Sequence, residues 1–212
     1  MTIIFFVLFL LCCTSSVLSV KDDEKVLLKI KKQLGDPDSL SWWVTGFDYC
    51  DASANTGPDF SYITCTDTGR VRSILLQNLN VNAPFPDAIC DLTYVQDLLL
   101  NNDPGLYGSI PSCITQLPNL WEVIITDTSF SEFSDNLYGF DLSHNKIFGK
   151  VPDSFATAAG LYFPNLSFNR LCGELPQGGN MGRFSAAVFA NNSCLCGNPL
   201  PPCSTSAPAP AS

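Results

Sequence analysis

The residues that could do chemistry in this chain are its cysteines, its single histidine and its many carboxylates. Ten cysteines occur among 212 residues, and two of them, Cys12 and Cys13, lie in an apolar leader. The remaining eight form an even set, which suits disulfide bonds in an oxidising compartment. A zinc site built from the "CLC" at 194–196 with Cys203 is the alternative, but thiolates of an exported chain oxidise first. The eight residues are Cys50, Cys65, Cys90, Cys113, Cys172, Cys194, Cys196 and Cys203.

The first 19 residues carry no charge and predict an export signal. The apolar run "IIFFVLFLLCC" is followed by the small residues "TSSVLS" and then by the charged "KDDEK". This order is typical of a cleaved signal peptide, to which we assign residues 1–19. A signal anchor is the alternative, although the run is shorter than the roughly 20 residues that a membrane span needs. We therefore expect a secreted protein without a transmembrane span.

Catalysis has few candidate residues. The only histidine, His144, stands beside Asn145, and the sequence contains no nucleophile motif, no phosphate-binding glycine loop and no metal-spaced cluster. A solvated surface residue is the plain interpretation of His144, and a place on a binding face is the other. The sequence thus predicts a non-enzyme with no cofactor and no metal site.

Carboxylates outnumber basic groups and are concentrated in the middle of the chain. Twenty acids against 11 Lys and Arg residues give a net charge of −9, and residues 87–141 hold nine acids without one Lys or Arg. Such a chain repels nucleic acid and acidic pectate. Its expected partner is a protein with a cationic surface, although a merely solvated acidic surface would have the same composition.

A helical cap is predicted to precede the main fold, within residues 20–70. The segment "DDEKVLLKIKKQLG" places Val26 or Leu27 on one helical face with Ile30 and Leu34, and it has acids at its start and Gly35 at its end. The bulky "SLSWW" and a loop between Cys50 and Cys65 complete this cap.

From Val71 onward the chain repeats the pattern L-x-x-L-x-L-x-x-N-x-L-x-G-x-I-P, which is typical of leucine-rich repeats. One turn of such a coil cannot bury its own apolar face, so successive turns must stack. We predict an α/β solenoid: a short right-handed coil with parallel strands on its concave face, a helical cap before it and a disulfide-stapled cap after it. An ordinary α/β domain would not explain five rows in register. The rows begin at Val71, Val95, Leu120, Leu137 and Leu161.

About five repeats fill residues 71–171, and their lengths are uneven. Successive rows are 24, 25, 17 and 24 residues apart, so the third is short and an irregular junction is expected near residues 131–136. The second row holds one inserted residue, and in the last row Pro164 stands where a buried strand residue is expected. Residues 172–203 form the predicted C-terminal cap, and the Ala/Pro/Ser tail at 204–212 is expected to be disordered.

Exposed strand positions should align into columns across the turns of such a coil. From these columns we select Asp97, Leu99, Glu122, Ile124, Thr126, Asp127, Asp141 and His144 as candidate protein-binding residues. The expected columns are Ser73, Asp97, Glu122, Gly139 and Phe163; Leu75, Leu99, Ile124, Asp141 and Asn165; Gln77, Asn101, Thr126, Ser143 and Ser167; and Asn78, Asn102, Asp127, His144 and Phe168.

Several segments resemble the plant polygalacturonase-inhibiting proteins in order. They are "KVLLKIKKQLGDPDSL", "IPSCITQLPNL", "DLSHNKIFGKVP", "NRLCGELPQGG" and "ANNSCLCGNPLPPC". Members of that family carry about twice as many repeats, so this chain resembles one that lacks the central repeats, with the cut between Phe130 and Leu137. The resemblance implies a monomeric leucine-rich-repeat protein of the cell wall that binds and inhibits fungal or insect endopolygalacturonases in plant defence.

The resemblance also implies the disulfides Cys50–Cys65, Cys172–Cys194 and Cys196–Cys203. Cys90 and Cys113 remain; they lie at matching places of neighbouring turns, within disulfide reach of each other. We expect them to pair, and two buried free thiols are the alternative. The sequons at Asn165 and Asn191 are expected N-glycosylation sites of this glycoprotein.

Two other functions stay open on the sequence alone. The family's inhibitory surface lies mainly on central repeats, and most of those are absent here. The chain could therefore be a non-inhibitory recognition module that partners a receptor kinase or another secreted protein. It could also be the product of a damaged gene that folds poorly.

Overall fold

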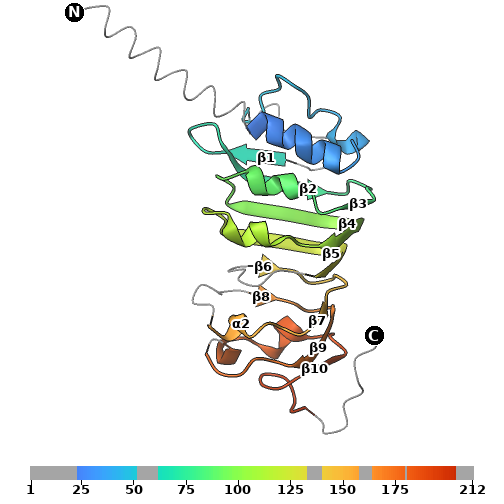
Figure 1. Ribbon diagram of the computed structural model, residues 1–212, viewed down its shortest axis with the longest axis vertical. Coiled ribbons are helices and arrows are strands. Elements are labelled where there is room, and N and C mark those ends of the chain that lie inside the picture. The colour runs from blue at the N-terminus through green and yellow to red at the C-terminus, as the bar shows by residue number, and fades with distance from the viewer. Residues whose placement is uncertain (1–22, 52–61, 133–139, 158–163, 180, 204–212) are drawn as a thin grey trace, which may run out of the picture.

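The turns of the chain stack into one elongated solenoid (Figure 1). The computed structural model describes residues 23–51, 62–132, 140–157, 164–179 and 181–203. The expected signal peptide, the tail and residues 133–136 of the expected junction lie outside these described residues. The predicted leucine-rich-repeat solenoid with its two caps is confirmed within the described part.

The N-terminal cap contains a helix that a salt bridge joins to the start of the first repeat. Residues 23–33 are helical, and Leu27 and Ile30 are fully buried. The helix is followed by Gly35 at a φ of 84°, a left-handed position that glycine adopts without a steric penalty. The guanidinium of Arg70 donates to both carboxylate oxygens of Asp23 at 2.8 Å. This buried bidentate pair fixes the helix to the start of the repeats.

One sheet runs the length of the repeats. Its strand order is β1-β2-β4-β5-β6-β8, with β3 pairing beside β4. The cap strand β1 is antiparallel to β2, and every later pair in the sheet is parallel, as stacked turns of one coil require. The strands are β1 Tyr62–Cys65, β2 Val71–Gln77, β3 Ala83–Pro84, β4 Asp97–Ser109, β5 Glu122–Glu132, β6 Phe140–Asp141 and β8 Pro164–Asn165.

Short helices and a second sheet make up the rest of each turn. The second sheet has the order β10-β9-β7. These connections are brief because a turn of about 24 residues must leave one strand and return to the next. They are η1 Asp38–Leu40, η2 Asp87–Asp91, η3 Ser112–Gln116, β7 Phe148–Gly149, α2 Ser154–Thr157, β9 Arg170–Glu174, η4 Met181–Arg183, η5 Ala186–Phe189 and β10 Cys194–Cys196.

The apolar columns predicted from the repeat pattern form the core. Ile74 pairs with Leu98, and Leu98 pairs with Val123, so that equivalent residues of three turns lie side by side. All three are at most 2% exposed. The short third row keeps this register, because Val123 pairs with Phe140 across the junction. Loss of seven residues from one turn therefore leaves the strand stacking intact.

Pro164 occupies the strand position that the sequence marks as unusual. It lies buried in β8, opposite Phe140 of β6. Because β8 is the last strand of the sheet, proline sits at an edge, where a missing ladder donor is tolerated.

Four disulfide bonds hold the caps and two of the turns. Cys90, in η2, joins Cys113, in η3, and so links neighbouring turns. The other three bonds are Cys50–Cys65 in the N-terminal cap and Cys172–Cys194 and Cys196–Cys203 in the C-terminal cap.

Gly105 gives a direct test of how tightly the first two turns are stacked. A Cβ at this position would lie 1.8 Å from the carbonyl oxygen of Val81, whereas a Cβ at Gly182 would meet nothing within 4 Å. Neither glycine has a positive φ. We predict that Gly105→Ala lowers the free energy of unfolding by about 3 kcal/mol or more, since backbone must move.

The measurement is urea unfolding of the secreted, disulfide-bonded chain, with Gly182→Ala as the matched control. Gly182→Ala should change the free energy of unfolding by less than about 1 kcal/mol. Equal stability of the two variants would show that the turns are not packed this closely.

Candidate protein-binding face

The strand register brings the predicted binding residues of β4, β5 and β6 together. Neighbouring strands lie about 4.8 Å apart, so paired residues touch across the sheet. We call the set Asp97, Leu99, Glu122, Ile124, Thr126, Asp127 and Asp141 the acidic face. The pairs are Asp97 with Glu122, Leu99 with Ile124, Asn101 with Thr126, and Ile124 with Asp141.

Exposure differs among these residues. Glu122 and Asp127 are exposed, whereas Asp97 and Asp141 are half-buried. Asp141 is also engaged within the protein: it accepts from the backbone N–H of Ser143 at 2.9 Å and from the Asn165 amide at 3.0 Å. The carboxylates most available to a partner are therefore Glu122 and Asp127, with Asp97 beside them.

The first turn contributes less to this face than the columns predict. Ser73 and Leu75 were expected to be exposed, but they are 7% and 8% exposed. The cap strand β1 pairs along β2 at these residues, which explains their burial. Ser143 and Ser167, expected in the third column, are also buried, because they lie where the chain turns inward toward Asn145 and Asn169. Gly139 and Phe163 lie outside the described residues.

A ridge of residues in the left-handed conformation borders the face. It consists of the fourth predicted column, Asn78, Asn102, Asp127, His144 and Phe168, whose φ angles are 54–57°. We call it the corner ridge. Such angles are common for Asn and Asp and rare for a residue as bulky as Phe. The sequence analysis placed these residues in one column but did not predict this backbone conformation.

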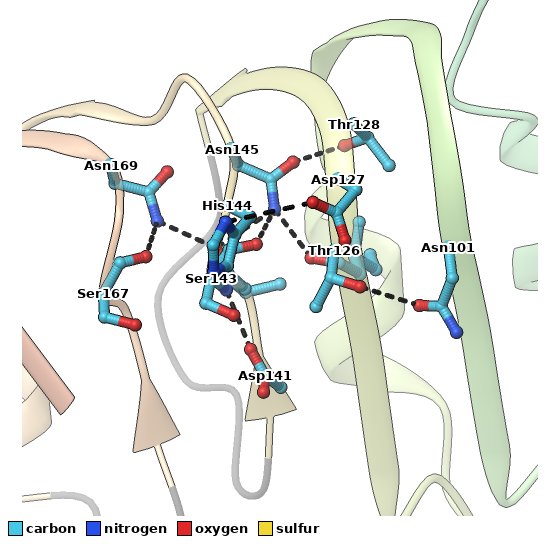
Figure 2. A network of polar contacts seen from close by, with 12 residues as sticks. Asn101, Thr126, Asp127, Thr128, Asp141, Ser143, His144, Asn145, Ser167 and Asn169 are labelled. Atoms are coloured by element: carbon cyan, nitrogen blue, oxygen red, sulfur yellow. Dashed lines mark hydrogen bonds and ion pairs between the residues drawn. The ribbon is translucent and has the colours of Figure 1, made fainter.

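His144 contacts two neighbours along the corner ridge, and Figure 2 shows the contact with Asp127. Its Nδ1 lies 3.9 Å from an Asp127 carboxylate oxygen, and its ring stacks on Phe168 with a centroid distance of 4.2 Å. His144 is thus an exposed residue of the ridge, which agrees with both interpretations of it: it is solvated, and it borders the acidic face.

Two buried asparagines, Asn145 and Asn169, form hydrogen bonds to the backbone next to the corner ridge (Figure 2). The Asn145 amide nitrogen donates to the backbone carbonyls of Ile125, Leu142 and Ser143 at 2.7–3.0 Å. Asn169 repeats this arrangement one turn later. Because each amide bridges its own turn and the preceding one, the exposed residues beside it are held in fixed positions.

Trp121 belongs beside the acidic face, and the sequence analysis missed it. It immediately precedes Glu122 and is 73% exposed, more than any other large apolar side chain of the described residues. Its backbone N–H donates to the Gln96 carbonyl, which keeps it in register with β4. The signal was present in the sequence: a tryptophan stands where the equivalent positions of earlier rows hold Arg72 and Gln96.

The two sequons differ in their surroundings. Asn191 is exposed in the C-terminal cap, with a φ of 57°. Asn165 is half-buried on β8, where its side-chain oxygen accepts from the backbone N–H and the hydroxyl of Ser167. Glycosylation of both residues stays a prediction. A glycan on Asn165 would cover the C-terminal end of the concave surface.

The described part of the chain contains neither a candidate metal site nor a candidate membrane span. No group of three or more His, Cys, Asp or Glu residues there could hold a metal ion. Nor is any helix among those residues both long enough and apolar enough to cross a membrane.

Curated relatives of the chain include several polygalacturonase inhibitors, although no family model matches it. Polygalacturonase inhibitor 1 of Oryza sativa subsp. japonica is 33% identical over 109 residues, which are 50% of this chain and 30% of that protein. The polygalacturonase inhibitor of Vitis vinifera is 47% identical over 77 residues, which are 36% of this chain and 23% of that protein. The matches thus span less than a third of these relatives' length.

Solved structures with the same fold are plant leucine-rich-repeat ectodomains. The BIR2 ectodomain from Arabidopsis thaliana superposes with a TM-score of 0.71 over 85% of this chain and 97% of that one, at 22% identity. The Arabidopsis receptor kinase HAESA, solved in complex with the peptide hormone IDA and the co-receptor SERK1, gives a TM-score of 0.62 at 26% identity. That match covers 73% of this chain and 26% of HAESA.

The sequence matches and the fold agree. The solved structures share the leucine-rich-repeat fold, and several of the curated matches are polygalacturonase inhibitors. The chain is a leucine-rich-repeat protein, and parts of its sequence are similar to the polygalacturonase inhibitors.

Proposed function

We propose that this chain is a secreted binding protein of the plant cell wall that inhibits endopolygalacturonases by occupying them with its acidic face. The observation that carries the proposal is the pairing of Asp97 with Glu122 and of the half-buried apolar Leu99 with Ile124 across adjacent turns, with the exposed Asp127 farther along β5. The curated polygalacturonase inhibitors among its relatives support the partner class. The four disulfide bonds suit an oxidising extracellular compartment.

Charge complementarity gives the proposed mechanism. An enzyme that grips polygalacturonate needs basic groups around its cleft, because its substrate is a polyanion. A rigid strip of carboxylates is attracted to such a rim and raises the rate of encounter. Apolar side chains in the middle of the strip supply contact area that excludes water. The protein then acts by stoichiometric blockage and performs no chemistry itself.

A recognition module for a receptor kinase is the second candidate function. It is favoured by the likeness to HAESA, whose structure was solved with a peptide hormone and a co-receptor. A short solenoid can present the same concave surface to such a partner. The two functions are distinguished by whether the purified chain slows the cleavage of polygalacturonate by an endopolygalacturonase.

Neutralising the acidic face is the first test. We predict that the triple variant Asp97→Asn, Glu122→Gln, Asp127→Gly inhibits endopolygalacturonases about 10-fold more weakly, because three rim ion pairs contribute roughly 0.5 kcal/mol each. The measurement is release of reducing ends from polygalacturonate by a panel of fungal and insect enzymes. Inhibition by the wild-type chain should itself weaken as salt is raised.

The matched control is the triple variant Asp36→Asn, Asp67→Asn, Asp153→Asn. It removes the same charge from exposed residues outside the acidic face and should inhibit as well as the wild-type chain. Equal weakening by both variants would show that inhibition depends on the net charge of the chain and not on the position of the acidic face. If the folded wild-type chain does not inhibit, the proposed function fails and the receptor-partner function takes its place.

Trp121 tests whether the bound area extends to the start of β5. Large aromatic side chains dominate interface energetics when a partner buries them, and truncation typically costs 2 kcal/mol or more. We predict that Trp121→Ala raises the inhibition constant by roughly 30-fold. Phe148→Ala is the control, since Phe148 is 56% exposed on β7 of the other sheet. A larger effect of Phe148→Ala would move the interface to that sheet.

A further inference from the structure

The buried asparagines of the later turns define a repeated position with two functions. In Asn169 the side-chain oxygen accepts from the backbone N–H of Ile147, in the preceding turn. Its amide nitrogen donates to the backbone carbonyls of Leu142, Leu166 and Ser167. The side-chain oxygen of Asn192 likewise accepts from the backbone N–H of Leu171. Its amide nitrogen donates to the backbone carbonyls of Leu166, Phe189 and Ala190. One half of the amide accepts and the other half donates.

Asp103 occupies the same position in the second turn. It follows Leu100 and Asn101 on β4, as Asn169 follows Leu166 and Ser167, and it is 1% exposed. Its Oδ1 accepts from the backbone N–H of Asn80, in the preceding turn, at 3.0 Å. This oxygen therefore accepts a backbone N–H, as the side-chain oxygens of Asn169 and Asn192 do.

The other carboxyl oxygen of Asp103, Oδ2, has no hydrogen-bond partner among the described residues. Asp103 Oδ2 is buried and makes no hydrogen bond as an acceptor among the described residues. It stands where the asparagines carry the amide nitrogen, so by register it faces the backbone carbonyls of Leu76, Leu100 and Asn101. Carbonyl oxygens repel a carboxylate oxygen and accept from a carboxylic acid O–H.

Among the described residues of the strands packed against β4, no charged side chain is buried beside Asp103. The strands packed against β4 are β2, β3 and β5. Arg72 of β2 and Glu122 and Asp127 of β5 are exposed to solvent, and β3 has no ionisable side chain. The side chain of Glu132, at the end of β5, lies outside the described part. On β4 itself, Asp97 is half-buried and Tyr107 is exposed. Burial raises the pKa of Asp103 from 3.8 to about 6, against backbone hydrogen bonds from Asn80 and Leu79 that lower it.

We propose that Asp103 is protonated in the folded protein at acidic pH and replaces the ladder asparagine of the second turn, its carboxyl O–H donating to the backbone carbonyls that face it. Loss of this proton puts a buried carboxylate against those carbonyls and loosens the contact between the first two repeats. The fold thereby contains a pH-sensitive element next to the acidic face, and this inference does not depend on what the face binds.

The direction of the effect follows from linkage. A group whose pKa is higher in the folded than in the unfolded state stabilises the fold at low pH. Its contribution is complete below about pH 4 and is lost as the pH rises to about 6. Above that pH both states are ionised and the contribution is constant. Asp103 therefore stabilises the fold more in an acidic compartment than at neutral pH.

Asp103→Asn supplies the donor at every pH and tests the proposal. The quantity to compare is the unfolding equilibrium constant of the wild-type chain divided by that of Asp103→Asn. We expect this ratio to rise on the order of 50-fold between pH 4 and pH 7. The measurement is urea unfolding of the full secreted chains with their disulfides intact, at pH steps across this range. Asp67→Asn, an exposed position, should follow the wild-type profile.

Parallel profiles of the wild-type chain and Asp103→Asn would overturn the proposal. If Asp103→Asn does not fold, the carboxyl carbon of Asp103 in the wild-type chain can be followed by NMR with ¹³C-labelled aspartate. Titration with a midpoint near pH 6 supports the proposal, and a midpoint below about pH 4.5 contradicts it.

Discussion

Each turn of this protein depends on its neighbours, because a single turn can neither bury its apolar strand face nor satisfy the carbonyls at its inner bend. Two features meet that constraint. Parallel strands hold leucine-type residues in register, as with Ile74, Leu98 and Val123. A buried amide such as Asn145 then joins the carbonyls of one turn to those of the turn before. The caps close the two ends that have no neighbour.

The same constraint creates the candidate binding face. Once the buried side chains of β4, β5 and β6 are in register, the alternating side chains must be in register too. Asp97 and Glu122 therefore lie side by side on one surface, although 25 residues, about one turn of the coil, separate them in the sequence. Since the strand pairing continues across the short third turn, the face is continuous from β4 to β6.

The sequence predicted the repeat, its rows and the order of the caps, because a period of about 24 residues is a strong signal. It also predicted which residues share a column. It did not predict the burial of Leu75, which depends on the antiparallel cap strand β1. The left-handed backbone of Phe168 was equally hidden, since local preference disfavours it and the turn geometry imposes it. Asp103 counted only as an acid until the structure showed its burial in an asparagine position.

The most direct test of the account is hydroxyl-radical footprinting of the secreted chain, free and saturated with an endopolygalacturonase. Radicals oxidise exposed aromatic and aliphatic side chains, so the method reports which ones a partner covers. The account predicts that Trp121 and Ile124 lose reactivity in the complex while Phe148, on the other sheet, keeps it. Protection of Phe148 with Trp121 unchanged would contradict the account, and so would unchanged reactivity everywhere.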